Sequence, residues 1–217
     1  VQADRMLELS GITYAPATTG AAVLKSVSLQ TQKGRPLLIA GASGSGKTSL
    51  LEIISGLAAG TSGSIRWNGN AMKRRQLRWL CGIVFQFPER HFLGLSVAQE
   101  LRLGHRRLGH EREQSVLARV GLDHITTTTA PERLSGGQQR RLALAVQLLR
   151  GAEVLLLDEP TAGLDWSVRR DVLDLLASLA RDQVLIVVTH EPELFRDWDC
   201  QRLLLQGGRL EPMTTLP

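Results

Sequence analysis

The sequence predicts an α/β fold built on a mostly parallel sheet covered by helices. Three short apolar runs are typical of buried central strands, at residues 36–40, 154–157 and 184–188. Residues 49–57 and 168–179 instead carry apolar side chains at helical spacing. Because strands that alternate with helices run parallel, these elements should share one sheet. The 217 residues suffice for one well-buried core, and we expect a single domain over residues 1–217.

The middle of the chain has a different pattern from its two flanks. From residue 95 to about 149 the apolar side chains recur at helical spacing, whereas the β-branched run 126–129 predicts a loop. We therefore interpret residues about 91–150 as a helical subdomain inserted into a core formed by about 1–90 and 151–217. Within that core, residues 6–9 and 27–30 alternate like strands, and 64–67 precede an Asn68-Gly69 turn.

The composition is that of a globular protein. Hydrophobic residues make up 43% of the chain and charged residues 22%, and no apolar run approaches the ~20 residues that cross a bilayer. The first residues are polar, so we expect no export signal, and a membrane would be reached through a partner. Cys81 and Cys200 lack metal-ligand spacing and should be buried, reduced thiols.

The net charge of +5 indicates little about partners by itself. Basic residues gather at 73–78 and 102–107. Such clusters could attract anionic lipid or polyphosphate, but a solvated helix face is the better interpretation. Nucleic-acid binding requires an element that reads bases as well as charge. We find none, so no nucleic-acid partner is expected.

A glycine-rich segment after the first apolar strand predicts a phosphate-binding loop. It matches the pattern Gly-x-x-x-x-Gly-Lys-Ser/Thr, follows a predicted strand and opens a predicted helix. The glycines let backbone N–H groups point at a phosphate, and the helix N-terminus adds a positive dipole. Lys47 would contact the β- and γ-phosphates of a nucleotide, and the Thr48 hydroxyl would bind Mg²⁺. The expected nucleotide-binding residues are Gly41, Ala42, Ser43, Gly44, Ser45, Gly46, Lys47, Thr48 and Ser49.

Two carboxylates follow the strand predicted over 154–157. Strand ends of a parallel sheet meet at one edge, where nucleotide sites form, so Asp158 should lie beside the phosphate loop. Asp158 can hold Mg²⁺ through a water, and Glu159 would face the γ-phosphate and polarise the attacking water. An acidic turn after a core strand is common by itself, but its occurrence together with the phosphate loop favours catalysis.

The segment Leu134-Ser135-Gly136-Gly137-Gln138 resembles the signature motif of the ABC ATPase family. Further motifs of the family stand in the expected order, namely an aromatic residue at Tyr14, a Q-loop glutamine at Gln86, a D-loop ending at Asp165 and a switch histidine at His190. The resemblance covers nearly the whole chain. It implies the ABC ATPase type of P-loop fold, with an N-terminal antiparallel β subdomain.

The resemblance also implies a role for each motif. Tyr14 would stack on the adenine of ATP, although a core or edge aromatic residue would look the same. Gln86 would sense Mg²⁺ and the γ-phosphate, and His190 would orient the water together with Glu159. The signature residues 134–138 would face the γ-phosphate held by a second ATPase subunit. ATP would therefore join two nucleotide domains, identical or different, and hydrolysis would release them.

The string Gln86-Phe87-Pro88-Glu89 is similar to the ATPases of energy-coupling factor (ECF) importers, which take up vitamins and transition-metal ions. Residues 90–94 depart from the usual acidic, Gln-rich continuation and are similar to compact cyanobacterial and plastid members. The resemblance implies a peripheral ATPase at the cytoplasmic face of the cell membrane, or the stromal face in a plastid. Its partners would be a multi-spanning T component and a substrate-binding membrane subunit, with Phe87, Phe92 and Leu93 either contacting the partner or packing locally.

Other functions stay open at this point. The chain could be the motor of a non-ECF ABC transporter, or a soluble ABC ATPase in an assembly or regulatory complex. The sequence shows neither the long coiled coil of repair-type members nor the second cassette of translation factors. A degenerate member that does not hydrolyse ATP is a further alternative, and the presence of Glu159, His190 and Ser135 argues against it.

Overall fold

Two β-sheets organise the chain, and the computed structural model describes residues 5–18 and 20–213. The smaller sheet is antiparallel, and its strand order is β2 (Leu24–Gln32), β1 (Met6–Tyr14), β4 (Ser62–Trp67) and β5 (Asn70–Ala71). The larger sheet has the order β10 (Arg209–Pro212), β9 (Gln201–Gln206), β3 (Leu37–Ala40), β8 (Val184–Thr189), β7 (Val154–Asp158) and β6 (Cys81–Val84). Its strands from β9 to β6 are parallel, and β10 is antiparallel to β9.

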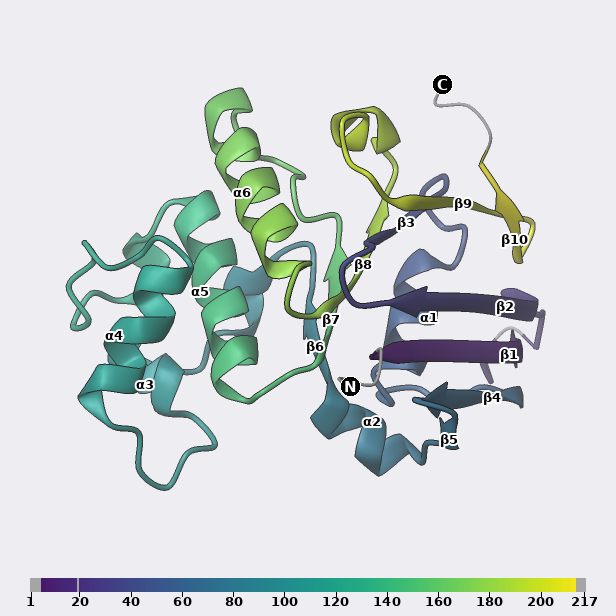
Figure 1. The fold of residues 1–217 in the computed structure, drawn as a ribbon, viewed down its shortest axis with the longest axis horizontal. Coiled ribbons are helices and arrows are strands. Elements are labelled where there is room, and N and C mark those ends of the chain that lie inside the picture. Colours follow the sequence, from purple (N-terminus) through teal and green to yellow (C-terminus); the bar gives the residue numbers. More distant parts are fainter. Residues whose placement is uncertain (1–4, 19, 214–217) are drawn as a thin grey trace.

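The helices divide between the two faces of the larger sheet. They are α1 (Lys47–Ile54), α2 (Arg74–Leu80), α3 (Val97–Arg102), α4 (His110–Arg119), α5 (Gly136–Leu149) and α6 (Trp166–Leu179). Three 3₁₀ turns are η1 (Pro88–His91), η2 (Pro131–Arg133) and η3 (Pro192–Phe195). Figure 1 shows α3 to α6 gathered on one side of the sheet, while α1 lies on the other side beside the smaller sheet.

The central strands of the larger sheet are buried on both faces, which explains why each reads as a continuous apolar run. In β7, Leu155 and Leu157 belong to the core cluster shared with α5 and α6. Val154 and Leu156, on the opposite face of the same strand, belong to the cluster shared with α1 and the smaller sheet. The larger sheet therefore separates two hydrophobic cores and holds its strand ends in fixed register.

The register places three chain segments side by side. Ala40, the last residue of β3, pairs with Thr189 of β8, and Val188 of β8 pairs with Asp158 of β7. The residues that follow β3, β7 and β8 thus emerge from neighbouring strands at one edge of the sheet. The sequence predicted this edge as the nucleotide site, and the predicted fold class is confirmed.

Several elements agree with the sequence pattern and others were not predicted. The Asn68-Gly69 turn joins β4 to β5, and both residues have positive φ, at 49° and 77°, as a type I′ hairpin turn requires. Helices α3 to α5 fall inside the segment interpreted as a helical subdomain, whose exact bounds remain a prediction. The sequence pattern did not reveal β6, β9 or β10, and it indicated α2 only through the basic helix face at residues 73–78. Within residues 5–18 and 20–213, no helix is long and apolar enough to cross a bilayer.

Candidate nucleotide site

The segment Gly41–Gly46 forms a tight loop between β3 and α1, at the sheet edge described above. Two of its glycines are required by close approach. A Cβ at Gly41 would lie 2.7 Å from the Leu205 carbonyl oxygen, and one at Gly46 would lie 2.8 Å from Val23 Cγ1. Gly46 also has a φ of 99°, a conformation that other residues rarely adopt. The loop is therefore shaped by glycine, as the motif predicts.

The positive end of α1 is left open at this loop. The helix begins after Gly46 without a side-chain cap, so its first N–H groups have no capping partner from a side chain. The Ser45 hydroxyl oxygen is buried and has no hydrogen-bond partner among the described residues. Lys47 is only 7% exposed, and its Nζ donates to the carbonyl oxygens of Gly41 (2.7 Å) and Ala42 (3.1 Å). An unsatisfied hydroxyl, free N–H groups and a cation at one helix N-terminus fit a phosphate.

Thr48 and Asp158 form the part of the site that fits Mg²⁺. The Thr48 hydroxyl donates to Asp158 Oδ2 at 2.7 Å. Burial raises the pKa of the Asp158 carboxyl, and the hydrogen bond from Thr48 opposes that shift. A buried carboxylate next to a hydroxyl is an oxygen donor pair of the kind that Mg²⁺ uses when phosphates and waters supply the remaining ligands. No cluster of three or more His, Cys, Asp or Glu side chains suitable for a metal occurs in the described part of the chain.

Glu159 lies at the centre of a network of polar contacts. It is 6% exposed, and its φ of 47° is rare for a residue other than glycine. Its Oε2 accepts hydrogen bonds from the Thr189 hydroxyl (3.0 Å) and from the His190 N–H (3.2 Å). Its Oε1 lies 2.8 Å from His190 Nδ1 and 3.6 Å from Lys47 Nζ. The strained backbone is over-determined by these contacts, which aim the carboxylate at Lys47.

This arrangement can bind and hydrolyse a nucleoside triphosphate. Lys47 and the open N-terminus of α1 offer positive charge where a terminal phosphate would lie, and Mg²⁺ held by Thr48 and Asp158 would neutralise negative charge there. Glu159 can accept a proton from a water that attacks this phosphate, and His190 can hold that carboxylate and the water in line. The structure thus brings together Lys47, Thr48, Asp158, Glu159 and His190, as predicted; their roles remain a proposal.

Comparisons with known proteins identify the family. A family model with the description "ABC transporter" matches residues 24–162. The chain belongs to the ABC transporter family. It is 41% identical over 201 residues to ABC transporter I family member 11 of the Arabidopsis thaliana chloroplast, a match that covers 85% of this chain and 72% of the relative. It is 36% identical to the energy-coupling factor transporter ATP-binding protein EcfA2 of Symbiobacterium thermophilum, with 93% of this chain and 75% of the relative covered.

A solved structure extends the likeness to the fold. The protein cbiO1 of Clostridium perfringens, described as part of the ABC transporter complex cbiONQ, superposes with a TM-score of 0.85. The two sequences are 27% identical, and the superposition covers 96% of this chain and 87% of that one. The ABC ATPase fold predicted from the sequence is therefore confirmed by this solved structure.

Of the other motif residues, Tyr14 lies near the phosphate loop, and Gln86 lies one strand further from it than Asp158. Tyr14, at the end of β1, accepts a backbone hydrogen bond from Val23 (2.8 Å), and Val23 approaches Gly46. Tyr14 therefore lies near the phosphate loop and is partly buried. Gln86 follows β6, one strand beyond β7, and no hydrogen bond of the described residues joins its side chain to Thr48 or Asp158. Its contact with Mg²⁺ therefore remains a proposal.

The ABC signature begins α5. Ser135 is the N-cap, its Oγ accepts from the Gln138 N–H, and the Gln138 side chain accepts from the Ser135 N–H, which completes a capping box. Leu134 is buried, and a Cβ on Gly137 would collide with Val168 of α6. Gly137 is therefore needed for helix packing. The resemblance to the ABC family implied only that the signature residues face a γ-phosphate. Within residues 5–18 and 20–213, no hydrogen bond links the signature to the phosphate loop of the same chain.

The D-loop residue Asp165 occupies the N-cap position of α6. Its side chain is exposed and makes no cap hydrogen bond. The neighbouring Trp166 is 75% exposed. Arg169 connects this segment to the switch region, because its Nε donates to the Leu164 carbonyl (2.8 Å) and its Nη1 lies 3.4 Å from Glu191.

Sequence reasoning missed two polar residues that hold the site. Thr189 orients Glu159 through its hydroxyl, and that oxygen also accepts from the Glu191 N–H at 3.0 Å. Arg140, in α5, is buried and contacts the segments after β6 and after β7. A signal for Arg140 was present, because it shares the buried face of α5 with Gly137 and Leu144. A charged residue on an apolar face indicates a specific partner.

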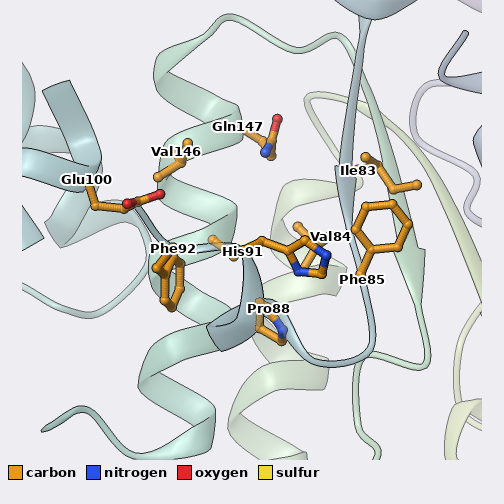
Figure 2. Close-up of a pocket in the computed structure, with 10 residues that line it drawn as sticks. Ile83, Val84, Phe85, Pro88, His91, Phe92, Glu100, Val146 and Gln147 are labelled. Atoms are coloured by element: carbon orange, nitrogen blue, oxygen red, sulfur yellow. The ribbon is translucent and has the colours of Figure 1, made fainter. Parts of the chain in front are cut away.

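A small pocket lies next to the Q-loop. Its volume is about 90 Å³, and its lining comes from the end of β6, from η1 and the residue after it, from α3 and from α5. Figure 2 shows His91 directed towards Phe85, and the two rings stack with centroids 5.0 Å apart. Phe92 also lines the pocket and is partly buried, whereas Phe87 and Leu93 are 40% and 80% exposed. Phe92 is thus packed locally, and Phe87 carries the Arg90 guanidinium over its ring at 4.7 Å from the centroid, whereas Leu93 points largely into solvent.

Proposed function

We propose that this chain is the ATP-hydrolysing subunit that drives an ECF-type ABC importer of a vitamin or metal ion. The observation that carries the proposal is the convergence of Lys47, Thr48, Asp158, Glu159 and His190 at one sheet edge. ATP would be the substrate, and Mg²⁺ would be its counter-ion. Thr48, Asp158 and Gln86 would hold this Mg²⁺. Tyr14 lies near enough to the phosphate loop to support stacking on adenine.

A second ATPase subunit completes the proposed site. The signature residues at the start of α5 make no hydrogen bond to the phosphate loop within residues 5–18 and 20–213, and we propose that the signature of another chain supplies the second half of each ATP site. The exposed Asp165 and the open face of the signature support such a contact. In this account, ATP holds two cassettes together and hydrolysis releases them.

The proposed membrane partner binds beside the Q-loop. Leu93 and Leu95 are 80% and 79% exposed, and α3 holds their backbone in place. The buried Glu100 carboxylate accepts from the N–H groups of Leu93 (2.9 Å) and Gly94 (2.7 Å), and Gln99 accepts from Leu95 (2.9 Å). Two apolar side chains are thus presented outwards on a fixed backbone, which suits a helix of a multi-spanning T component.

The relatives support an ECF-type assembly at a membrane surface. The Symbiobacterium relative is named as an energy-coupling factor ATP-binding protein, and the Clostridium structure belongs to a three-component transporter complex. We propose that the chain works as a peripheral subunit at the cytoplasmic face of a membrane. A chloroplast relative makes the stromal face the equivalent place in a plastid.

Affinity purification from native membranes tests this function. Tagged parent protein in mild detergent should retain a multi-spanning membrane protein, and Leu93→Ser should lose it because an apolar contact is removed. Leu57→Ser is the matched control, since Leu57 is also exposed (47%) but lies beyond the end of α1. Recovery of soluble proteins alone, with no membrane protein bound to the parent, would refute the transporter assignment.

A further inference from the structure

Arg140 joins three motif segments that lie far apart in the sequence. It lies in the second turn of α5, the helix that the signature opens, and it is 6% exposed. Its Nη2 donates to the Gln86 carbonyl at 3.1 Å and also to the Ala162 carbonyl. Gln86 is the Q-loop residue, and Ala162 is the first residue of the D-loop, three residues after Glu159. One guanidinium group therefore contacts the backbone of both segments.

The contact to Ala162 leads directly to the proposed general base. The Ala162 N–H donates to the Glu159 carbonyl at 3.1 Å, which closes the turn after β7. A displacement of Ala162 would therefore alter this turn, in which Glu159 already has a strained backbone. Through Arg140 the turn is tied to Gln86 on one side and to the signature helix on the other.

The burial of Arg140 is costly and therefore informative. A buried guanidinium is tolerated when its donors are satisfied, yet Nε of Arg140 has no partner among the described residues. Burial lowers the pKa of Arg140, and the nearby Glu89 opposes this shift. Apolar packing against α6 would be served better by a leucine at this position. A buried charge with an unsatisfied donor lowers stability in general, so its presence at this position points to a role beyond packing.

We propose that Arg140 is a positioning residue that holds the Q-loop and the Glu159 turn in one fixed relation to the signature helix. When the membrane partner shifts the Q-loop, Arg140 transmits the shift to the turn that carries Glu159. The planar fork of arginine can reach two carbonyls at once, whereas the single ammonium of lysine cannot satisfy both with the same geometry. This inference rests on the proposed ATPase function, because it assigns a role within that reaction.

The test compares Arg140→Lys with Arg141→Lys in the full chain. Arg141 lies next to Arg140 on α5 but bonds elsewhere, to the Gly121 carbonyl (3.5 Å) and to Asp171 (3.2 Å). We expect Arg140→Lys to speed amide hydrogen exchange in residues 83–90 and 159–165 together. The Kd for ATP should stay within about twofold, while kcat falls by about tenfold or more, because Glu159 is misplaced rather than lost. Arg141→Lys should change none of these quantities.

Two results would overturn the inference. One is a kcat within about twofold of the parent value in Arg140→Lys; the other is faster exchange in only one of the two segments. If Arg140→Lys does not fold, Arg140→Gln, which removes the buried charge and keeps a donor, is measured in the same way. If the parent itself hydrolyses no ATP, the proposed function fails. Amide hydrogen exchange measured without nucleotide still tests whether Arg140 links the two segments.

Discussion

Replacing Glu159 with Gln isolates the chemical step from ATP binding. Glu159 and Lys47 are both buried, and their charges lie 3.6 Å apart. At an effective dielectric constant of about 20 this attraction is about 4–5 kcal/mol before desolvation is counted, and the net value after desolvation is far smaller. A neutral glutamine removes the attraction, so Lys47 becomes more available to phosphate. We expect the Kd for ATP to be unchanged or to tighten by up to about tenfold, or 1.4 kcal/mol.

The same substitution should nearly abolish turnover. A glutamine amide can still accept from Thr189 and from the His190 N–H, so the local structure should persist. It cannot accept the proton of the attacking water, and loss of a general base lowers kcat by about 10²–10⁴-fold. With hydrolysis blocked, ATP should hold two cassettes together, and size-exclusion chromatography should show an ATP-dependent dimer.

The assay combines ATP titration at equilibrium, phosphate release and chromatography. Glu153→Gln is the matched control, because Glu153 lies just before β7 as Glu159 lies just after it, and among the described residues its carboxylate pairs with the partly exposed Arg5 alone. The control should keep the parent kcat and Kd. Hydrolysis at the parent rate by Glu159→Gln, or a Kd weakened more than about tenfold, would show that the role given to Glu159 is wrong.

Four further predictions concern other residues of the site and the core. Lys47→Ala should abolish ATP binding measured by titration, because the buried cation that faces the phosphate is lost; unchanged affinity would refute the phosphate-loop assignment. Burial raises the pKa of Asp158, so its ionised form destabilises the folded state once the pH exceeds the ordinary Asp pKa. Asp158→Asn should therefore raise the Tm of the nucleotide-free protein at pH 7, and this gain should shrink as the pH falls towards the ordinary Asp pKa and be absent below it; a lower Tm at pH 7 would contradict the sign. Burial raises the pKa of Cys81 to about 12, so a thiol reagent should modify Cys81 only after unfolding, and rapid labelling of the folded protein would contradict its placement. Gly137→Ala should lower the free energy of unfolding by about 1–3 kcal/mol through collision with Val168, and Val168→Ala should restore part of it in the double variant; if the second change adds to the loss, the collision is not the cause.

The sequence predicted the catalytic cluster because its motifs are local. The glycine-rich loop, the carboxylates after β7 and the histidine after β8 each follow a buried strand, and parallel strands must end at a common edge. The predicted buried, free state of Cys81 and Cys200 is confirmed. The relation of the signature to the phosphate loop of another chain could not come from this chain alone, and it remains a proposal.

Features that depend on long-range contacts could not be predicted from the sequence. The basic segment 73–78 was interpreted as a solvated helix face, and α2 is exposed there. Arg74 and Arg78, however, also donate to the Gly56 carbonyl, and Arg74 reaches the Leu57 carbonyl, so they hold the chain at the end of α1. Their partners lie about 20 residues upstream in the sequence. The stacking of the exposed His91 on Phe85 beside the Q-loop also has no local sequence signal. Arg140 likewise gains its role from residues 86 and 162.

ATP hydrolysis by the complex purified from native membranes tests the central claim most directly. The parent complex, reconstituted in lipid vesicles, should release phosphate in a Mg²⁺-dependent reaction, and the same complex carrying Lys47→Ala should not. A complex without ATPase activity, or with activity that does not depend on Lys47, would contradict the account that this chain is the motor of a membrane transporter.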